Sequence, residues 1–207
     1  MTDDRDPQDV SIRLSEYEAL RREIEMRATL ASSLVALELS ALGIGLVSAG
    51  ETLDLYPGLG FLSTMLWLFW LDHTEQIWKL ATYISVRLRP SLQSVAPRSL
   101  DWERFLRELD AQKAVRSTNY AAFYITLLFA VVPPLLTAVY VVRIVEAGTS
   151  AEAVAPVRLV VAVVVIAFWV FGMTQFREFN RSRRHMDERI SSSQERLSPA
   201  EWCKSGS

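Results

Sequence analysis

The chain has 207 residues, half of them hydrophobic, and a formal net charge of −2. A soluble domain of this length has too little interior to bury so much apolar surface in long runs, which argues against an ordinary soluble globule. The nearly balanced charge argues against a nucleic-acid-binding protein, and the single cysteine, Cys203, excludes an internal disulfide.

The first predicted element is a helix that continues into a membrane span. Residues 1–14 are acidic and are expected to be disordered. Ser15 and Glu18 form a capping box, which predicts a helix start. Residues 28–49 then carry one charge, Glu38, and are long enough for a helix to cross a hydrocarbon core of about 30 Å.

A second span is predicted for residues 57–77. Its first fifteen residues are uncharged and cover about 22 Å of helix, so Asp72, His73 and Glu75 are expected at the inner edge of the membrane. One interpretation is that the helix leaves the lipid here and becomes amphipathic. The other is a wet cytoplasmic vestibule lined by Asp72 and Glu75, with His73 turned inward.

Residues 78–117 are predicted to form a cytoplasmic helical hairpin with a proline-containing break. The third span, residues 118–142, is uncharged, but Pro133 and Pro134 interrupt its backbone hydrogen bonding and predict a kink. This kink has two interpretations, a static bend or a hinge that acts as a gate.

The fourth span is predicted for residues 157–176, and residues 179–207 form a basic tail that is expected to be largely disordered. Basic side chains beside an anionic leaflet each contribute about 1 kcal/mol to membrane attachment. The residues expected to contact lipid headgroups are Arg177, Arg181, Arg183 and Arg184.

The basic residues predict the orientation. Of the 22 lysines and arginines, only Arg143 and Arg158 fall in the loops after the first and third spans. The positive-inside rule therefore places both termini and the middle loop in the cytoplasm. Together the elements predict an all-α fold: a polytopic membrane protein whose four transmembrane helices extend into a short cytoplasmic helical bundle.

Glu38 stands about ten residues inside the first span, where a charge costs a few kcal/mol. Its helical face is shared by small residues, Ala31, Gly45 and Ala49, which let another helix approach closely. We therefore expect Glu38 to pack against the second span, within reach of Thr64, Asp72 or His73. It is either a structural hydrogen-bonding group that holds the two spans in register or an ion- or proton-sensing carboxylate.

A second row of small residues, four apart, runs along the same helix: Ala28, Ser32, Ala36 and Ser40. It has two interpretations, packing within one chain or a face for self-association. The sequence holds no Walker loop, dinucleotide fingerprint, G-x-S-x-G or H-E-x-x-H motif, and no spacing typical of metal ligands. We therefore expect a protein that is not an enzyme and that uses neither a cofactor nor a metal.

Three segments in order, "SEYEALRREI", "LDHTEQIWKLATYI" and "LDWERFLRELD", make the chain similar to a group of small bacterial four-span membrane proteins of unassigned activity. The resemblance extends from about Ser15 to Phe176. It implies a multi-pass protein of the bacterial inner membrane, and it brings no catalytic or binding residues.

The predicted function is a membrane module or pore-like effector that responds to a cytoplasmic protein or small-molecule signal. Its expected partners are the lipid bilayer and further copies of the chain, with no nucleic acid. The alternative is a small proton-coupled transporter that uses Glu38, with His73 as relay. The two halves of the chain show no internal repeat, which weakens that alternative.

Overall fold

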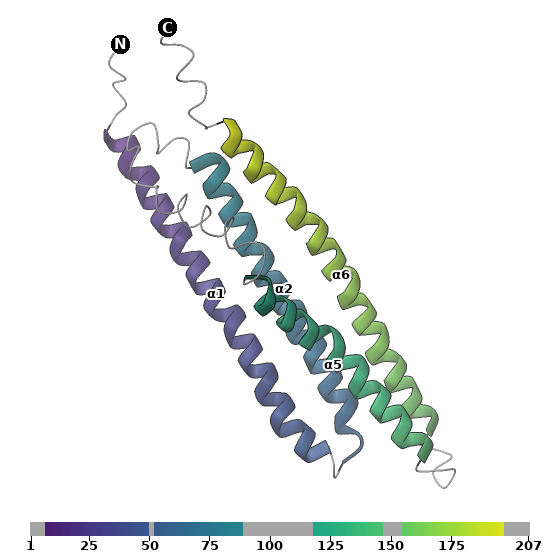
Figure 1. The fold of residues 1–207 in the computed structure, drawn as a ribbon. Helices are drawn as coiled ribbons and strands as arrows, with labels where there is room; N and C mark the ends of the chain where they lie inside the picture. Colours follow the sequence, from purple (N-terminus) through teal and green to yellow (C-terminus); the bar gives the residue numbers. More distant parts are fainter. Residues whose placement is uncertain (1–6, 50–51, 89–117, 147–154, 197–207) are drawn as a thin grey trace. The chain divides into compact units, whose positions relative to one another are not determined.

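The computed structural model describes residues 7–49, 52–88, 118–146 and 155–196, and all elements in these ranges are helices (Figure 1). Helix α1 comprises Pro7–Ala49 and helix α2 comprises Leu55–Tyr83. A short π-helical segment, η1 (Ile84–Leu88), continues α2. The remaining helices are α5, Thr118–Glu146, and α6, Ala155–Arg196. The all-α fold class is therefore confirmed.

Three helices in the described part of the chain are long and apolar enough to cross a membrane, judged by length and composition. These segments are Val10–Ala49, Phe123–Glu146 and Pro156–Ile190. Helix α2, which contains the predicted second span, is not among them. Its uncharged stretch is short and includes glycine, serine and threonine, and charged residues from Asp72 onward follow it. The described helices thus support a membrane protein, while the count of four spans stays a prediction.

The ends of the long helices differ from the predicted boundaries. Helix α1 begins at Pro7, and proline suits a first helical position because its missing N–H would have had no partner there. Ser15 consequently lies inside the helix, where its hydroxyl donates to the Ile12 carbonyl at 2.8 Å and does not act as a cap. Of the predicted hairpin 78–117, only the part up to Leu88 lies within the described residues.

Helix α6 also extends further than expected, to Arg196, through part of the predicted disordered tail. Ion pairs at helical spacing accompany this extension. Arg183 Nε lies 4.0 Å from an Asp187 oxygen, and His185 Nδ1 lies 3.5 Å from a Glu188 oxygen. Pairs three and four residues apart stabilise a helix slightly, so the basic composition of this segment is compatible with helical structure.

The chain divides into two compact units, and helices α1, α2 and α6 contribute to both. We call the unit built from Leu30–His73 and Arg116–Phe179 the apolar unit. We call the unit built from Met1–Thr29, Thr74–Val115 and Asn180–Ser207 the polar unit. Each is described below from its own contacts.

Aromatic contacts join the helices of the apolar unit. Trp67 of α2 is fully buried and packs against Phe176 of α6, with ring centroids 5.6 Å apart. Two further ring pairs join α2 to α6 and to α5: Phe61 with Phe168 at 4.7 Å, and Trp70 with Phe129 at 6.2 Å. Aromatic pairs of this kind contribute more than the area they bury. Helix α2 is therefore held by rings from two neighbouring helices.

Two glycines allow α2 to approach these neighbours closely. A methyl group on Gly172 of α6 would lie 3.3 Å from the Trp67 ring. A methyl group on Gly60 of α2 would lie 3.3 Å from the Val165 side chain and 3.5 Å from the Pro133 carbonyl oxygen. Small residues at helix contacts are typical of membrane proteins, where close packing replaces the hydrophobic effect.

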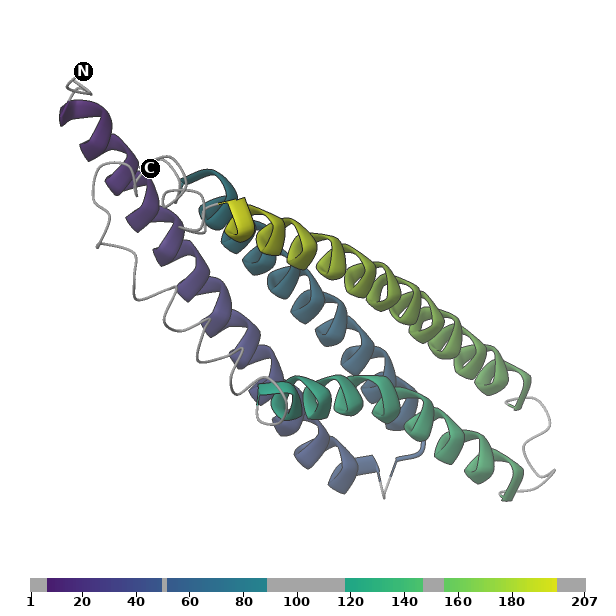
Figure 2. The same ribbon diagram turned by 45° about the horizontal axis from the view of Figure 1, so that its top comes forward.

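Helix α5 contains the proline pair and bends along its length, as Figure 2 shows. Pro134 has no N–H, so the carbonyl of Ala130, four residues earlier, loses its helical donor. The indole N–H of Trp169, on α6, donates to this carbonyl oxygen at 3.0 Å. A contact from another helix thus replaces the hydrogen bond that the proline removes, which matters because an unpaired carbonyl in hydrocarbon costs several kcal/mol.

We expect Trp169→Phe to lower the free energy of unfolding by about 1–2 kcal/mol, because it removes the donor and keeps a ring of similar shape. In a Pro134→Ala background the helix supplies its own N–H to the Ala130 carbonyl, so Trp169→Phe should lower the free energy of unfolding by much less. Chemical unfolding of the four proteins in detergent micelles gives the coupling between the two sites. Equal costs in both backgrounds would contradict this account.

Candidate functional site

Glu38 lies in the interior of the apolar unit and is 1 % exposed. Ser63 of α2, also 1 % exposed, donates its hydroxyl hydrogen to Glu38 Oε1 at 2.5 Å. A hydroxyl that donates to a carboxylate typically makes such a short bond. Glu38 therefore packs against protein and joins α1 to α2, which is the geometry of a group that fixes the register of two helices.

The partner of Glu38 differs from those expected. Thr64, the next residue, donates to its own helix at the Gly60 carbonyl, at 2.9 Å. Sequence reasoning missed Ser63, although it is one of only two hydroxyl residues in the uncharged stretch 57–71. Either hydroxyl residue satisfies the chemistry, and only the rotation of α2 about its axis decides between them.

His73 does not share this site. It lies ten positions after Ser63 on α2, which corresponds to about 15 Å along a helix. Its Nδ1 atom is buried and has no hydrogen-bond partner among the described residues. Asp72 is exposed, and Glu75 forms an ion pair with Lys79 at 2.8 Å, as its helical spacing predicts. Glu38 and His73 therefore make no direct contact through which a proton relay could run.

The two small-residue rows on α1 differ in environment. Ala31 and Ala49 are buried with Glu38, while the Leu59 side chain occupies the space next to Gly45. The second row is exposed throughout the described structure: Ala28, Ser32, Ala36 and Ser40. Helix α1 thus presents one face to its own chain and leaves the other uncovered.

A cluster that sequence reasoning missed joins three elements of the apolar unit. Arg158, near the start of α6, pairs with Asp54 in the turn before α2, and its Nε atom lies 3.1 Å from Oδ1. Tyr140 of α5 is 2 % exposed and lies beside the same carboxylate. From the sequence, Arg158 predicts only the orientation of the chain. No sequence pattern indicates that its partner is Asp54, more than a hundred residues earlier.

The predicted headgroup arginines occupy different environments. In the polar unit the Arg183 guanidinium stacks over the Trp78 ring, 4.6 Å from its centroid, and Arg181 and Arg184 are exposed. Arg177, in the apolar unit, is also exposed. The cation–π contact uses the face of the guanidinium, while its Nε atom, at the edge, lies 4.0 Å from Asp187.

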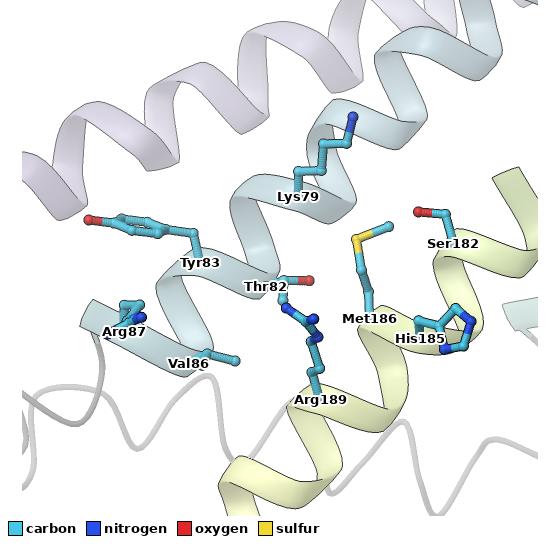
Figure 3. A pocket seen from close by; sticks show the side chains of 9 residues that line it. All are labelled: Lys79, Thr82, Tyr83, Val86, Arg87, Ser182, His185, Met186 and Arg189. Carbon is cyan, nitrogen blue, oxygen red and sulfur yellow. The ribbon is translucent and has the colours of Figure 1, made fainter.

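The polar unit contains a pocket of about 690 Å³ between α2 with η1 and α6 (Figure 3). Both walls follow helical spacing, because the lining residues recur at intervals of three and four along each helix. The lining residues are Lys79, Thr82, Tyr83, Val86 and Arg87 on one wall and Ser182, His185, Met186 and Arg189 on the other. The described lining carries three permanent cations, one histidine and no carboxylate.

Next to this pocket, α1 and α2 are joined by polar and apolar contacts. The Tyr83 hydroxyl donates to Glu16 Oε1 at 2.8 Å, and this carboxylate raises the pKa of Tyr83 because it accepts the phenolic hydrogen. The buried Leu88 packs against Tyr17 of α1. Tyr83 is thereby directed toward α1, in agreement with its direction in Figure 3.

Compared with protein-family models, curated proteins and solved structures, the chain shows no significant match. The resemblance to small bacterial four-span membrane proteins therefore rests on its three sequence segments alone.

We expect Ser63→Ala to lower the free energy of unfolding in detergent micelles by about 1–3 kcal/mol, because it leaves a buried carboxyl group without its partner. The control is Ser48→Ala. That hydroxyl is exposed and donates to the Ile44 carbonyl of its own helix, so its loss should change stability by less than about 0.5 kcal/mol. Equal effects of the two substitutions would show that the buried bond does not hold the helices together.

Proposed function

We propose that the chain is a multi-pass protein of the bacterial inner membrane, with four spans and both termini in the cytoplasm. We further propose that it is not an enzyme. It acts as an oligomeric membrane module, a pore-like effector that responds to a cytoplasmic protein or small-molecule signal.

The observation that carries the proposal is the uncovered apolar surface of the three membrane-length helices. Within their most apolar stretches, only 17 %, 28 % and 17 % of the residues are buried. Ile44, Val47 and Val145 are all more than 70 % exposed. In water a surface of this kind causes aggregation, so lipid or further copies of the chain must cover it.

Helix α2 fits a fourth span although its composition is less apolar. Its buried residues include Ser63, Thr64 and Trp67, and rings from α5 and α6 pack against it. A helix shielded from lipid by its neighbours can contain glycine and hydroxyl residues that a lipid-facing helix would avoid. The distribution of basic residues also supports a crossing here, because the positive-inside rule favours the N-terminal segment and the loop after α2 on the same side.

The exposed small-residue row of α1 supports the oligomer. Ser32, Ala36 and Ser40 lie on the face opposite the buried Glu38, and small side chains permit another helix to approach closely. Because the described part of one chain offers few buried polar groups, a pathway between chains is a better candidate for permeation than a pathway through one bundle.

The alternative, a proton-coupled transporter, is favoured by the buried Glu38 and by the unpartnered Nδ1 of His73. The separation of about 15 Å along α2 between Ser63 and His73 means that intermediate groups would be needed for a relay.

The topology is tested by cysteine labelling in a Cys203→Ser background. A membrane-impermeant maleimide added to spheroplasts should label Ser150→Cys, in the loop before α6, and should not label Ser94→Cys, in the middle loop. Lysed cells, in which both positions should react, are the control. Labelling of Ser94→Cys in intact spheroplasts would invert the orientation.

The function is tested with the purified protein in dye-loaded liposomes. We expect dye release when cytoplasmic extract is added, and we expect Glu38→Gln to release dye as well as the unchanged chain does. Native mass spectrometry in detergent should show more than one copy per particle. Vesicles that release no dye under any condition would contradict the proposal of a pore-like effector. Proton uptake that is abolished by Glu38→Gln would favour the transporter.

A further inference from the structure

The cationic pocket of the polar unit has the features of a binding site for an anion. Figure 3 shows the Arg189 side chain extending from α6 toward Thr82 on α2, with Ser182 and Met186 above it on the same helix. Tyr83 is directed away from this space. The pocket therefore has Arg189 and the Ser182 hydroxyl on the wall formed by α6. The wall formed by α2 and η1 has two cations, Lys79 and Arg87, and the Thr82 hydroxyl.

Two lining residues lie beside acids of their own helices. Glu75 pairs with Lys79, and Glu188 lies beside His185. Both pairs are at the surface, where an ion pair is weak, and a lysine ammonium has two further hydrogens to donate. Lys79 can thus accept a negative group without first losing a strong contact.

The arrangement favours a tetrahedral oxyanion. A planar carboxylate presents two oxygens in one plane, whereas donors on two facing helices suit a group whose oxygens point in several directions. Arginine and lysine are the side chains that most often bind phosphate. The volume of about 690 Å³ exceeds the size of phosphate alone and lies in the range of small-molecule sites. Val86 and Met186 add apolar lining for the rest of such a ligand.

We propose that this pocket binds the phosphate group of a small amphipathic molecule, with Arg189 and Lys79 pairing with its oxygens and Ser182 donating a hydrogen bond. The proposal names the chemical class of the signal in the proposed function, and it rests on that function only for the cytoplasmic location of the pocket. The phosphate belongs either to an anionic phospholipid headgroup or to a soluble compound.

The full-length protein in nanodiscs distinguishes these sources. In one arm, native mass spectrometry measures phosphatidylglycerol retained from mixed phosphatidylcholine–phosphatidylglycerol discs. In the other, calorimetry measures binding of adenosine monophosphate to protein in phosphatidylcholine discs. We expect saturable binding in one arm. An absence of binding in both arms would overturn the proposal.

Matched variants test the site itself. Arg189→Gln should weaken binding about tenfold or more, because it removes a charge-assisted hydrogen bond. Arg184→Gln removes the same charge from the same helix, but Arg184 does not line the pocket, so binding should change by less than about twofold. Equal weakening by the two substitutions would show that general surface charge, and not this pocket, attracts the probe.

A substitution that removes no charge gives a second test. Ser182→Leu removes the hydroxyl and fills part of the pocket with an apolar side chain, so it should also reduce binding, with helix content by circular dichroism as the folding control. Undiminished binding by this variant would contradict the site. These assays need no permeation, so a chain that binds the probe but leaves vesicles tight overturns only the proposed function. A chain that releases dye but ignores both probes overturns only the pocket.

Discussion

The structure depends on one constraint: a polar group among hydrocarbon-facing helices is costly unless it finds a partner within the protein. The constraint explains the interhelical hydrogen bonds of the apolar unit. The Trp169 indole supplies the donor that Pro134 cannot, and Ser63 supplies the donor for the buried Glu38. In each case a group that would be costly by itself becomes a contact between two helices. These two hydrogen bonds are thus points of attachment between otherwise apolar helix surfaces.

Helix α2 shows that the amino-acid composition of a helix need not predict how deeply it packs inside the protein. It has the less apolar sequence, yet it contributes Trp67, the largest fully buried side chain, and packs against aromatic rings of α5 and α6. The three membrane-length helices, α1, α5 and α6, leave most residues of their most apolar stretches unburied. The packing of α2 depends on the fit of aromatic rings and on the absence of a side chain at Gly172.

The division into two units suggests a division of tasks within the proposed function. The apolar unit offers wide apolar faces and one exposed row of small residues, which suit lipid and other copies of the chain. The polar unit offers a pocket whose permanent charges are positive, and Tyr83 and Leu88 attach its wall to α1.

The sequence by itself determined the all-helical class, the long apolar runs and the anomaly at Glu38, because these follow from local composition and spacing. It did not determine the helix ends at Pro7 and Arg196, where weak local contacts extend a helix beyond its apolar part. Only the tertiary structure decided that Ser63 pairs with Glu38 and that Arg158 pairs with another part of the chain. The physical reason is that such partners depend on how each helix is rotated against its neighbours. A rotation of a fraction of a turn selects a different side chain, while the sequence pattern of each helix stays the same.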